Sequence, residues 1–445
     1  MSTAARRPLR IGVVPILDGS GGGIYQYSLT MLDGLLAIEP RPELVLLADR
    51  RSRARAEAWR ARGYQVEYVW PLRWRLLAAG RRALRLGPVG KGAARIVAGL
   101  RKRRPSVDDK YRVRGRPTFG KWIARFGVDF LVIPAPSRMG FESGVPYVMA
   151  VHDLQHRLQP EFPEVSAGGE WERREYLFRN GISHALTVLV DSETGREDVL
   201  NCYGNVVSDE RVQILPFLPP SYIAVSSAKP ETTRIHERFG LPGRYLFFPA
   251  QFWPHKNHVR VVEALAQIRA ERGVDVAVVM CGSAADELRG SVLDQVRQTA
   301  ADRGVANLIQ IIGYVEDGYM ASLYAASAGV LLPTFFGPTN IPILEAWAFG
   351  VPVLSSDLRG IREQCGDAAI LVDPTSVQAI ADGIYSLWSD DGLRAELVAA
   401  GARRLAQYGP NDYVSRLSAI VADAARRVQA PQERQAAPPE HVVEP

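Results

Sequence analysis

Short apolar runs alternate with helical segments, and this alternation occurs twice along the chain. Continuous apolar runs separated by helices are typical of a parallel sheet that helices cover on both faces. The alternation stops near residue 216, where the prolines and small polar residues of PFLPPSYIAVSSAKPETT predict a linker. The sequence therefore predicts two doubly wound α/β domains. The predicted strands are residues 9–16, 44–49, 128–135, 145–153 and 185–192 in the first half, and 245–250, 274–282, 308–315, 328–334 and 351–356 in the second.

The chain has 445 residues, which is too many for one hydrophobic core. We expect an N-terminal domain at residues 1–216, a linker at 217–243 and a second domain at 244–405. A helix at 406–428 is expected to pack back toward the first domain. The Pro-, Gln- and Glu-rich residues 429–445 are expected to be disordered. Ligands of doubly wound sheets bind at the carboxyl ends of the strands, so the expected site is a cleft between the domains.

Three features favour a cytoplasmic protein. No apolar run reaches the roughly 18 residues that cross a bilayer. The apolar residues near the N-terminus are followed directly by Asp18 and a glycine run, so they predict a first strand better than a signal peptide. Cys202, Cys281 and Cys365 lie far apart without metal-ligand spacing, which indicates free buried thiols in a reducing compartment.

The charge is unevenly distributed. Residues 50–125 hold 23 Lys and Arg against 4 Asp and Glu, in a chain whose formal net charge is +6. Trp and Leu side chains are interspersed among these arginines, a pattern that can lie on an anionic membrane surface. Solvated arginine-rich helices are the alternative. Nucleic-acid binding is not expected, because no known module is recognisable there.

Residues 336–356, FGPTNIPILEAWAFGVPVLSS, predict a loop, a helix and a strand. Asn340 suits the N-cap, Pro342 suits the first turn, and Gly350 suits the position just past the helix. The unpaired N–H groups of a helix start can bind a phosphate or a diphosphate. Glu345, about one turn into the helix, could then accept hydrogen bonds from the hydroxyls of a neighbouring ribose. An ordinary capped helix with a surface glutamate is the alternative.

Other motifs lie at the ends of predicted strands. Gly22 and Gly23 belong to a glycine-rich turn that lets backbone N–H groups approach an anion or a sugar. His152 ends an apolar strand and can bind a sugar hydroxyl or transfer a proton. Lys256 follows the first strand of the second half, and its charge suits a departing diphosphate. The alternatives are a tight turn, a structural histidine and a solvent-facing lysine.

Together these motifs resemble those of the family 4 glycosyltransferases, which have two Rossmann-like domains facing a cleft, the glycosyltransferase B (GT-B) fold. The most specific segments are VHDLQH at 151–156, PAQFWPHKNH at 249–258 and FGPTNIPILEAWAFGVPV at 336–353. They are similar to a bacterial mannosyltransferase-like branch. The resemblance covers nearly the whole chain. It implies a retaining transferase that uses a nucleoside diphosphate sugar, with no cofactor and no essential metal.

The resemblance also implies roles for particular residues. Glu345 matches the second glutamate of the E-x7-E motif, which binds the ribose, and Lys256 matches the lysine that binds the diphosphate. His152 matches a histidine that contacts the sugar. The implied catalytic residues are His152, Lys256 and Glu345, and the implied donor-binding residues are Gly22, Gly23, Gln251, Lys256, Thr339, Asn340, Ile341 and Glu345.

Two positions depart from the family pattern. The first glutamate of E-x7-E falls on Gly337, which removes a carboxylate from the donor sugar. The arginine five residues before the lysine is Gln251, which removes a positive charge from the leaving group. Thr339, Asn340 and the backbone at 340–342 are expected to replace the sugar and phosphate contacts, and Arg359 and Arg362 are the candidates for the missing charge.

The expected function is therefore transfer of a sugar, with mannose favoured, to a hydroxyl of a glycan or a lipid-linked acceptor. The chain is expected to act in the cytoplasm or on the inner membrane leaflet. The alternatives are a degenerate glycosyltransferase that serves as a scaffold, and a nucleotide-sugar epimerase or glycan phosphorylase on the same fold. The sequence does not identify the base, the sugar, the acceptor, the linkage or the oligomeric state.

Overall fold

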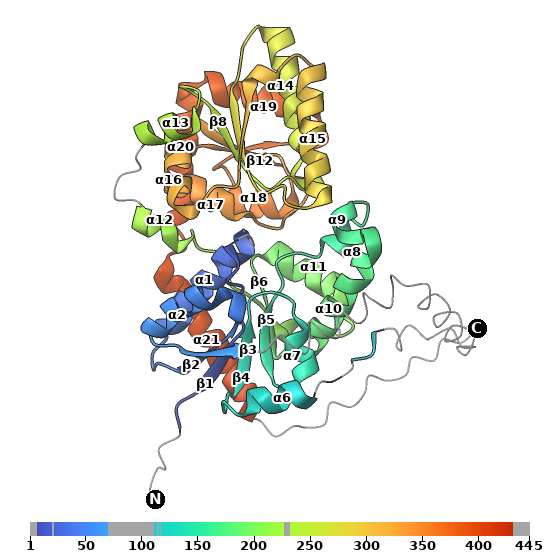
Figure 1. Ribbon diagram of the computed structural model, residues 1–445, viewed down its shortest axis with the longest axis vertical. Helices are drawn as coiled ribbons and strands as arrows, with labels where there is room; N and C mark the ends of the chain where they lie inside the picture. The colour runs from blue at the N-terminus through green and yellow to red at the C-terminus, as the bar shows by residue number, and fades with distance from the viewer. Residues whose placement is uncertain are drawn as a thin grey trace, which may run out of the picture.

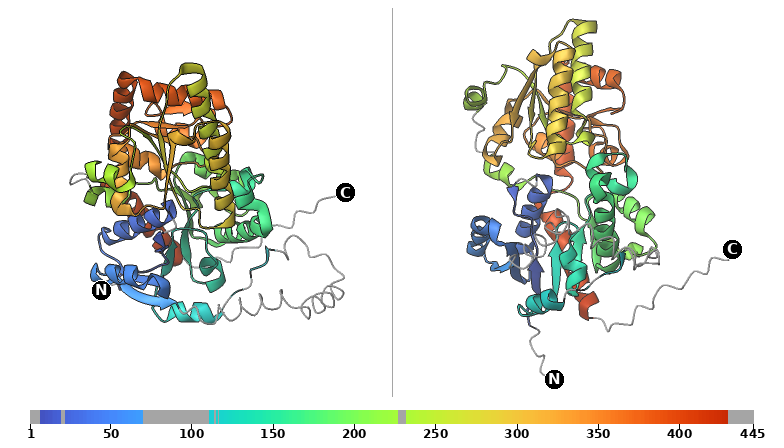
Figure 2. Two further views of the ribbon diagram at one scale, coloured as in Figure 1. Left: turned by 45° about the horizontal axis from the view of Figure 1, so that its top comes forward. Right: turned by 45° about the vertical axis from the view of Figure 1, so that its right-hand side comes forward.

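The computed structural model describes residues 7–19, 22–69, 111–113, 115, 117–226 and 232–429, which form two α/β domains. The domains lie one above the other in Figure 1, and Figure 2 shows the same arrangement from two further sides. Each domain contains one sheet, and all of the strand pairs within it are parallel. The predicted fold class, two doubly wound α/β domains, is confirmed.

The first sheet has the strand order β3-β2-β1-β4-β5-β6-β7. Its strands are β1 (Arg10–Val13), β2 (Glu43–Asp49), β3 (Gln65–Val69), β4 (Phe130–Ile133), β5 (Tyr147–Ala150), β6 (Thr187–Val190) and β7 (Val212–Ile214). Its helices are α1 (Gly23–Leu36), α2 (Arg53–Ala61), α6 (Pro117–Ala124), α7 (Arg138–Ser143), α8 (Gln155–Leu158), α9 (Pro163–Ser166), α10 (Glu170–His184) and α11 (Glu193–Tyr203).

The second sheet has the strand order β10-β9-β8-β11-β12-β13. Its strands are β8 (Leu246–Pro249), β9 (Val278–Cys281), β10 (Ile309–Gly313), β11 (Gly329–Leu332), β12 (Val353–Ser356) and β13 (Ile370–Val372). The helices of this half are α12 (Ser221–Ser226), α13 (Thr232–Phe239), α14 (His258–Arg272), α15 (Glu287–Asp302), α16 (Asp317–Ala326), α17 (Ile341–Ala348), α18 (Arg359–Cys365), α19 (Val377–Ser389), α20 (Asp391–Ala406) and α21 (Pro410–Gln429).

Each sheet has a hydrophobic core on both faces, because successive side chains of a strand point to opposite sides. In β4, Phe130 and Val132 pack into one core, whereas Leu131 and Ile133 pack into the other. All four side chains are buried, as expected for a central parallel strand. The continuous apolar runs of the sequence are therefore strands that are covered on both faces.

Three strands were not predicted, and all three lie at sheet edges: β3, β7 and β13. An edge strand has one neighbour, so it can be short or carry polar side chains, and it then lacks a continuous apolar run. β3 (QVEYV) lies within the basic segment and contains Glu67, and β7 is only three residues long. A signal based on apolar runs misses these two strands, whereas β13 is apolar but only three residues long.

The chain crosses between the domains twice. The predicted linker contains two helices, α12 and α13, and both pack against α16. The C-terminal helix α21 returns to the first domain and packs against α1. Its Tyr413, Leu417 and Ile420 are buried in the core of that domain. Of the tail predicted to be disordered at 429–445, Gln429 ends α21 and residues 430–445 lie outside the described residues.

Candidate active site

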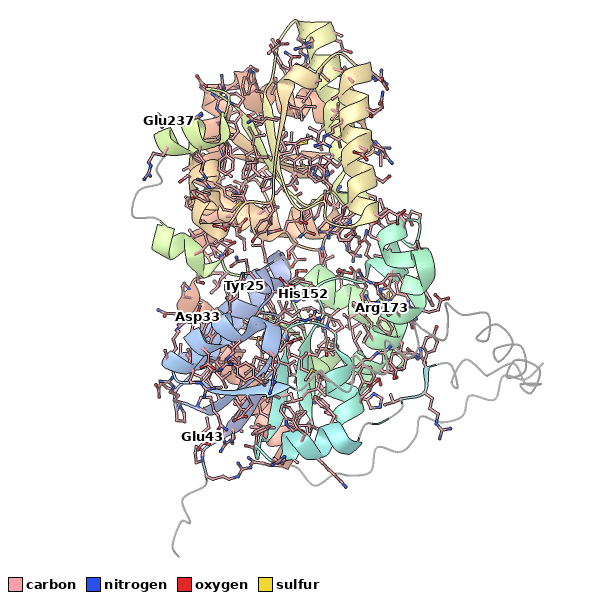
Figure 3. All side chains as sticks on the ribbon, in the orientation of Figure 1. Tyr25, Asp33, Glu43, His152, Arg173 and Glu237 are labelled. Carbon is pink, nitrogen blue, oxygen red and sulfur yellow. The ribbon has the colours of Figure 1, made fainter. Side chains whose placement is uncertain are left out.

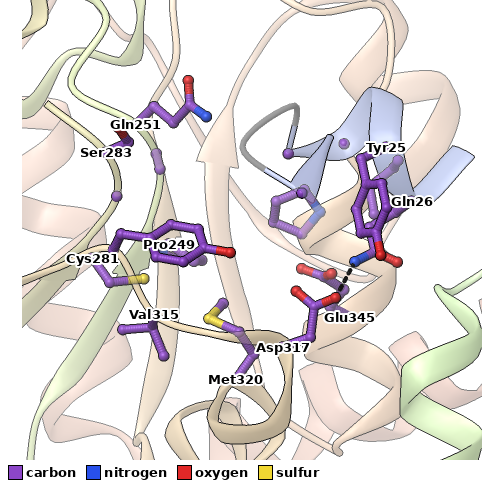
Figure 4. Close-up of a pocket in the computed structure, with 18 of the residues that line it drawn as sticks. Tyr25, Gln26, Pro249, Gln251, Cys281, Ser283, Val315, Asp317, Met320 and Glu345 are labelled. Atoms are coloured by element: carbon purple, nitrogen blue, oxygen red, sulfur yellow. Dashed lines mark hydrogen bonds between the residues drawn. The ribbon is translucent and has the colours of Figure 1, made fainter. Parts of the chain in front are cut away.

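A pocket lies between the carboxyl ends of the two sheets. The first domain lines it with the glycine turn and the start of α1, and the second domain with the loops after β8, β9 and β10 and the start of α17 (Figure 4). Five predicted donor-binding residues line it together, namely Gly22, Gly23, Gln251, Ile341 and Glu345. The structure thus brings together segments that are more than 300 residues apart in the sequence.

The glycine turn contacts the second domain. Gly22 has φ 56° and ψ −128°, a conformation that residues with a Cβ rarely adopt. A Cβ at Gly22 would lie 3.6 Å from the amide nitrogen of Gln251, and one at Gly23 would lie 3.4 Å from Cδ1 of Ile341. The turn therefore passes close to two other predicted donor-binding residues.

The side chain of Gln251 is fixed at the end of β8. Trp253 Nε1 and Arg289 Nη1 donate hydrogen bonds to its Oε1 at 2.9 and 3.0 Å. Trp253 is two residues further along the same loop, and Arg289 belongs to the first turn of α15. The carboxamide is thus oriented by groups from two elements of the second domain.

Lys256 lies in the same loop, at the end of a 3₁₀ turn formed by Pro254–Lys256. The turn is joined to the first domain, since His255 Nδ1 lies 2.6 Å from a carboxylate oxygen of Glu164. Burial lowers the pKa of Lys256 to about 8, and the charges of Asp153 and Glu164 act in the opposite direction. Within the described part of the chain, its ammonium group makes no hydrogen bond or ion pair. Lys256 is thus a positive charge at the domain interface with free capacity for an anion, although it does not line the pocket itself.

The start of α17 differs from the prediction. Asn340 occupies the N-cap position, but its side chain makes no capping hydrogen bond. Its backbone N–H donates to Oε1 of Gln364 at 2.8 Å, and Pro342 has no N–H to offer. Neither Asn340 nor Thr339 lines the pocket, and the hydroxyl of Thr339 donates instead to Asp191 of the first domain. The expected contacts of Thr339 and Asn340 with a donor are therefore not formed by residues lining this pocket, and they stay a prediction.

Glu345 is buried, with 7% of its surface exposed, so the alternative of a surface glutamate is wrong. Its two carboxylate oxygens accept hydrogen bonds from the hydroxyls of Tyr222, at 2.9 Å, and Tyr324, at 2.5 Å. Burial raises the pKa of Glu345, and the two tyrosine hydrogen bonds oppose this rise. The carboxyl group lies at the pocket, and Tyr222 lines the pocket beside it.

His152 lies at the end of the first domain that faces the second, as Figure 3 shows. Its Nε2 is 2.6 Å from the carbonyl oxygen of Pro134. A carbonyl can only accept, so we assign the ring proton to Nε2, which leaves Nδ1 as an acceptor. Burial lowers the pKa of His152, which favours the neutral ring. His152 is therefore suited to accept a hydrogen bond from a hydroxyl, and it does not line the pocket directly.

The departure from the family pattern at Gly337 has a structural explanation. Gly337 has φ 140°, a conformation that glutamate would adopt only with strain. Neither arginine proposed to replace the missing charge lines the pocket; Arg359 pairs with Asp198 and Arg362 pairs with Asp357. The expectation for these two arginines stays a prediction.

Sequence reasoning missed several pocket residues. Gln26 Nε2 donates to Oδ2 of Asp317 at 3.0 Å, a contact between the domains that Figure 4 shows at the pocket. The position of Gln26, four residues after the glycine turn's Gly22, was a usable signal, because the first turn of such a helix faces the ligand. Tyr222 and Asp317 had no comparable signal, since only the folded chain brings them to Glu345 and Gln26.

In the parts of the chain that the structure describes, no group of three or more His, Cys, Asp or Glu side chains could hold a metal ion. No helix among the described residues is long and apolar enough to cross a bilayer. Most of the basic segment, including residues 70–110, lies outside the described residues. The predicted contact of this segment with a membrane stays a prediction.

Two comparisons relate the sequence to known proteins. A family model described as "Glycosyl transferases group 1" matches residues 231–404. O-antigen chain mannosyltransferase B of Escherichia coli is 26% identical over 323 residues, which are 71% of this chain and 79% of that protein. D-inositol 3-phosphate glycosyltransferase of Xylanimonas cellulosilytica is 28% identical over 243 residues, and the match spans only 55% of its length.

A third comparison concerns solved structures. Anabaena HepE in complex with UDP and glucose superimposes with a TM-score of 0.66 and 16% identity, over 93% of this chain and 99% of that one. WaaG, a glycosyltransferase involved in lipopolysaccharide biosynthesis, superimposes with a TM-score of 0.61 and 14% identity, over 92% of this chain and 99% of that one. At these identities the likeness establishes the two-domain fold.

Proposed function

We propose that this chain, a glycosyltransferase of the two-domain GT-B fold related to the group 1 family, moves a sugar from a nucleoside diphosphate sugar to an acceptor hydroxyl with retention of anomeric configuration. The observation that carries the proposal is the shared pocket. The glycine turn of one domain meets Gln251, Ile341 and Glu345 of the other at the carboxyl ends of both sheets. That is where doubly wound domains bind nucleotides.

The chemical problem is to stabilise a leaving diphosphate while the sugar becomes cationic. We assign the anion to the side of the pocket formed by the loop after β8. Lys256 supplies a positive charge there, and Gln251 and the backbone of the glycine turn supply N–H donors. The backbone N–H of Ile341 adds the positive end of the α17 dipole. These groups would replace a metal ion, so we propose that the reaction needs none.

We assign no enzymic nucleophile. The carboxyl groups that line the pocket are Asp317 and Glu345, and both are already hydrogen bonded, Asp317 to Gln26 and Glu345 to two tyrosines. The acceptor hydroxyl would attack from the face that the diphosphate leaves, and its proton would pass to the departing phosphate oxygen. Closure of the domains would align the groups and exclude water, which competes as an acceptor.

Glu345 and His152 would orient the donor. The buried carboxyl of Glu345 would accept from ribose hydroxyls, which requires the hydroxyl of Tyr222 to move or to share its acceptor. His152 would accept from a sugar hydroxyl through Nδ1. Neither role involves a change of covalent bonds, so both residues would act by binding.

We favour a mannose-like sugar and a glycan or lipid-linked acceptor, because the Escherichia coli relative is named a mannosyltransferase of the O-antigen chain. The basic segment at 50–125 would hold the enzyme against an anionic leaflet where such acceptors are found. Charge reversal of Arg81, Arg82, Arg101, Lys102 and Arg103 tests this part. Sedimentation with anionic liposomes should be lost, and unchanged sedimentation would reject the membrane proposal.

The proposed activity is tested in two steps. A thermal-shift screen against UDP, GDP, ADP and dTDP sugars should show one selectively stabilising donor. NMR of the product formed from that donor should then show the same anomeric configuration as the donor. Inversion at the anomeric carbon would reject the retaining mechanism, and no stabilisation by any donor would reject the donor site.

One alternative function is that of a protein with the same fold but without catalytic activity. The glycine at 337 and the neutral side chain of Gln251 would suit a degenerate transferase that binds nucleotide sugars and serves as a scaffold. Donor binding without turnover against glycan and lipid-linked acceptors would favour it. Consumption of the nucleotide sugar without any acceptor would favour an epimerase.

A further inference from the structure

We propose that Arg289, in the first turn of α15, is a positioning residue for the donor diphosphate. It fixes the carboxamide of Gln251 so that the amide N–H groups serve the diphosphate, and it places a second cation behind them. This inference rests on the proposed function, because it assumes that a nucleoside diphosphate occupies the pocket.

The orientation of Gln251 follows from its partners. Trp253 Nε1 and Arg289 Nη1 can only donate, and both bond to the same side-chain oxygen, at 2.9 and 3.0 Å. The oxygen of the carboxamide is thereby identified, and the nitrogen takes the other side. That nitrogen lies 3.6 Å from where a Cβ of Gly22 would be, against the glycine turn. The N–H groups of Gln251 thus point to the side of the pocket where backbone donors of the turn are found.

Arg289 is itself held in place. Its Nε pairs with Oδ2 of Asp286 at 2.6 Å, and its guanidinium lies 4.8 Å from the ring centre of Trp253. Its side chain is only 14% exposed, whereas that of Asp286 is 43% exposed. Arg289 thus lies beside Gln251 where solvent screens it little, and its counter-charge on Asp286 is the more exposed of the two.

A cation bonded to the oxygen of an amide makes the amide a better donor. The guanidinium draws electron density toward Oε1, and the N–H groups at the other end become more positive. The effect reaches the pocket although Arg289 does not line it. It also complements Lys256, whose pKa of about 8 means that its own charge declines in mildly alkaline solution.

The test compares ligands that differ only in phosphate. We would measure by calorimetry the Kd of GDP, UDP, ADP and dTDP, and of the corresponding nucleosides, for the full chain and for Arg289→Met. We expect the variant to bind its preferred diphosphate roughly tenfold more weakly, about 1.4 kcal/mol, and the nucleoside with unchanged affinity. The matched control is Arg297→Met, two turns further along α15, whose side chain is 61% exposed and pairs only weakly with Asp294 at 3.8 Å. It should change neither Kd.

A double variant of Arg289 and Gln251 distinguishes a positioning role of Arg289 from a general contribution to the stability of the fold. Gln251→Ala should weaken diphosphate binding as Arg289→Met does, and the double variant should lose little more, because the two residues act as one unit. Arg289→Lys should recover only part of the affinity, since an ammonium group cannot pair with Asp286 and reach Gln251 in the same fork geometry. If Arg289→Met does not fold, Trp253→Phe keeps an aromatic ring at this position but removes the indole N–H donor, and it should weaken binding of the diphosphate but not of the nucleoside.

The outcomes separate this inference from the proposed function. If the unaltered chain binds none of the nucleoside diphosphates, the proposed function fails. If it binds one and Arg289→Met binds that ligand equally well, only the positioning role is overturned. An equal loss for nucleoside and diphosphate would also overturn it, because a merely structural arginine would weaken both.

Discussion

Two loops at the carboxyl edge of the second sheet use their polar groups in opposite ways. The loop after β8, residues 250–257, carries Lys256 and directs Gln251 toward the pocket. In the loop after β11, residues 333–340, polar groups make hydrogen bonds within the protein. The hydroxyl of Thr339 bonds to Asp191, and the backbone of Asn340 bonds to the side chain of Gln364. Both loops were expected to bind the donor.

The second loop belongs to a set of contacts that join the domains. Close to the bond between Thr339 and Asp191, the carboxylate of Glu363 on α18 accepts the backbone N–H groups of Glu193 and Thr194 at the start of α11, at 2.7 and 2.9 Å. A carboxylate at a helix N-terminus is stabilised by the helix dipole. Both loops contact the first domain, the β8 loop through His255 and Glu164, but only the β8 loop carries groups that we assign to the diphosphate.

The largest effect is expected at Lys256. Lys256→Ala should lower kcat/KM by about 10²–10³-fold, because removing one group that stabilises the developing charge costs this much in comparable sites. Steady-state kinetics with the donor found in the screen would measure it, and the circular dichroism spectrum should stay unchanged. A loss of less than threefold would remove Lys256 from the leaving-group site.

Glu345→Gln is expected to have the next largest effect. The substitution keeps the shape of the side chain but removes the charge that accepts from hydroxyls, so donor affinity should fall by roughly ten- to a hundredfold. Glu345→Ala is a poorer test, because it would leave the hydroxyls of Tyr222 and Tyr324 without their acceptor. Tyr222→Phe is the control, and it should bind donor at least as tightly as the unaltered chain. Unchanged donor affinity of Glu345→Gln would contradict the ribose assignment.

The pH profile tests the charge at the β8 loop. The ammonium group of Lys256 loses its proton as pH rises through its pKa of about 8, so kcat/KM should fall above that pH by about tenfold per unit. Lys256→Arg should retain measurable transfer and keep its rate constant up to about pH 10, because a guanidinium stays protonated there. A profile in which both proteins decline together above pH 8 would assign the decline to another group.

Gly337→Glu tests whether the missing carboxylate of the β11 loop can be restored. At φ 140° a residue with a Cβ is strained by about 1–3 kcal/mol, so the midpoint of thermal unfolding should fall and turnover should not rise. Gly337→Ala is the matched control, because it carries the same backbone strain without the carboxylate. An increase in kcat for the glutamate variant alone would show that the loop adapts and that its role is chemical.

The smallest effect is expected at Thr339. Thr339→Val removes the hydroxyl that donates to Asp191 and keeps the shape of the side chain. Because Thr339 lies outside the pocket, kcat/KM should change by no more than about threefold, far less than for loss of a group that stabilises the transition state. A loss comparable to that of Lys256→Ala would erase the distinction between the two loops.

The sequence was most informative where a single local pattern determines the structure. The central strands follow from continuous apolar runs, and the segments around Gly22, Gln251 and Glu345 follow from turns and helix starts at strand ends. The structure brings the residues that these patterns singled out to one pocket at the carboxyl edges of the sheets. The edge strand β3 was missed because it alternates polar and apolar residues within a basic segment.

What the sequence could not provide are partners from distant segments. Nothing near Gln251 in the sequence indicates that Arg289 would bond to it, and Arg359 and Arg362 were chosen only because they follow a strand. The hydrogen bond from the hydroxyl of Thr339 to Asp191 crosses the domain interface, so it depends on how the two domains dock. Such contacts follow from tertiary packing and not from the local pattern.

The most direct measurement is a crystal structure of the chain with its preferred nucleoside diphosphate. Our account predicts that the diphosphate lies between the glycine turn and the β8 loop, with a phosphate oxygen within hydrogen-bond distance of Lys256 Nζ and of the amide nitrogen of Gln251. A diphosphate bound instead at Thr339 and Asn340, remote from Lys256, would contradict it.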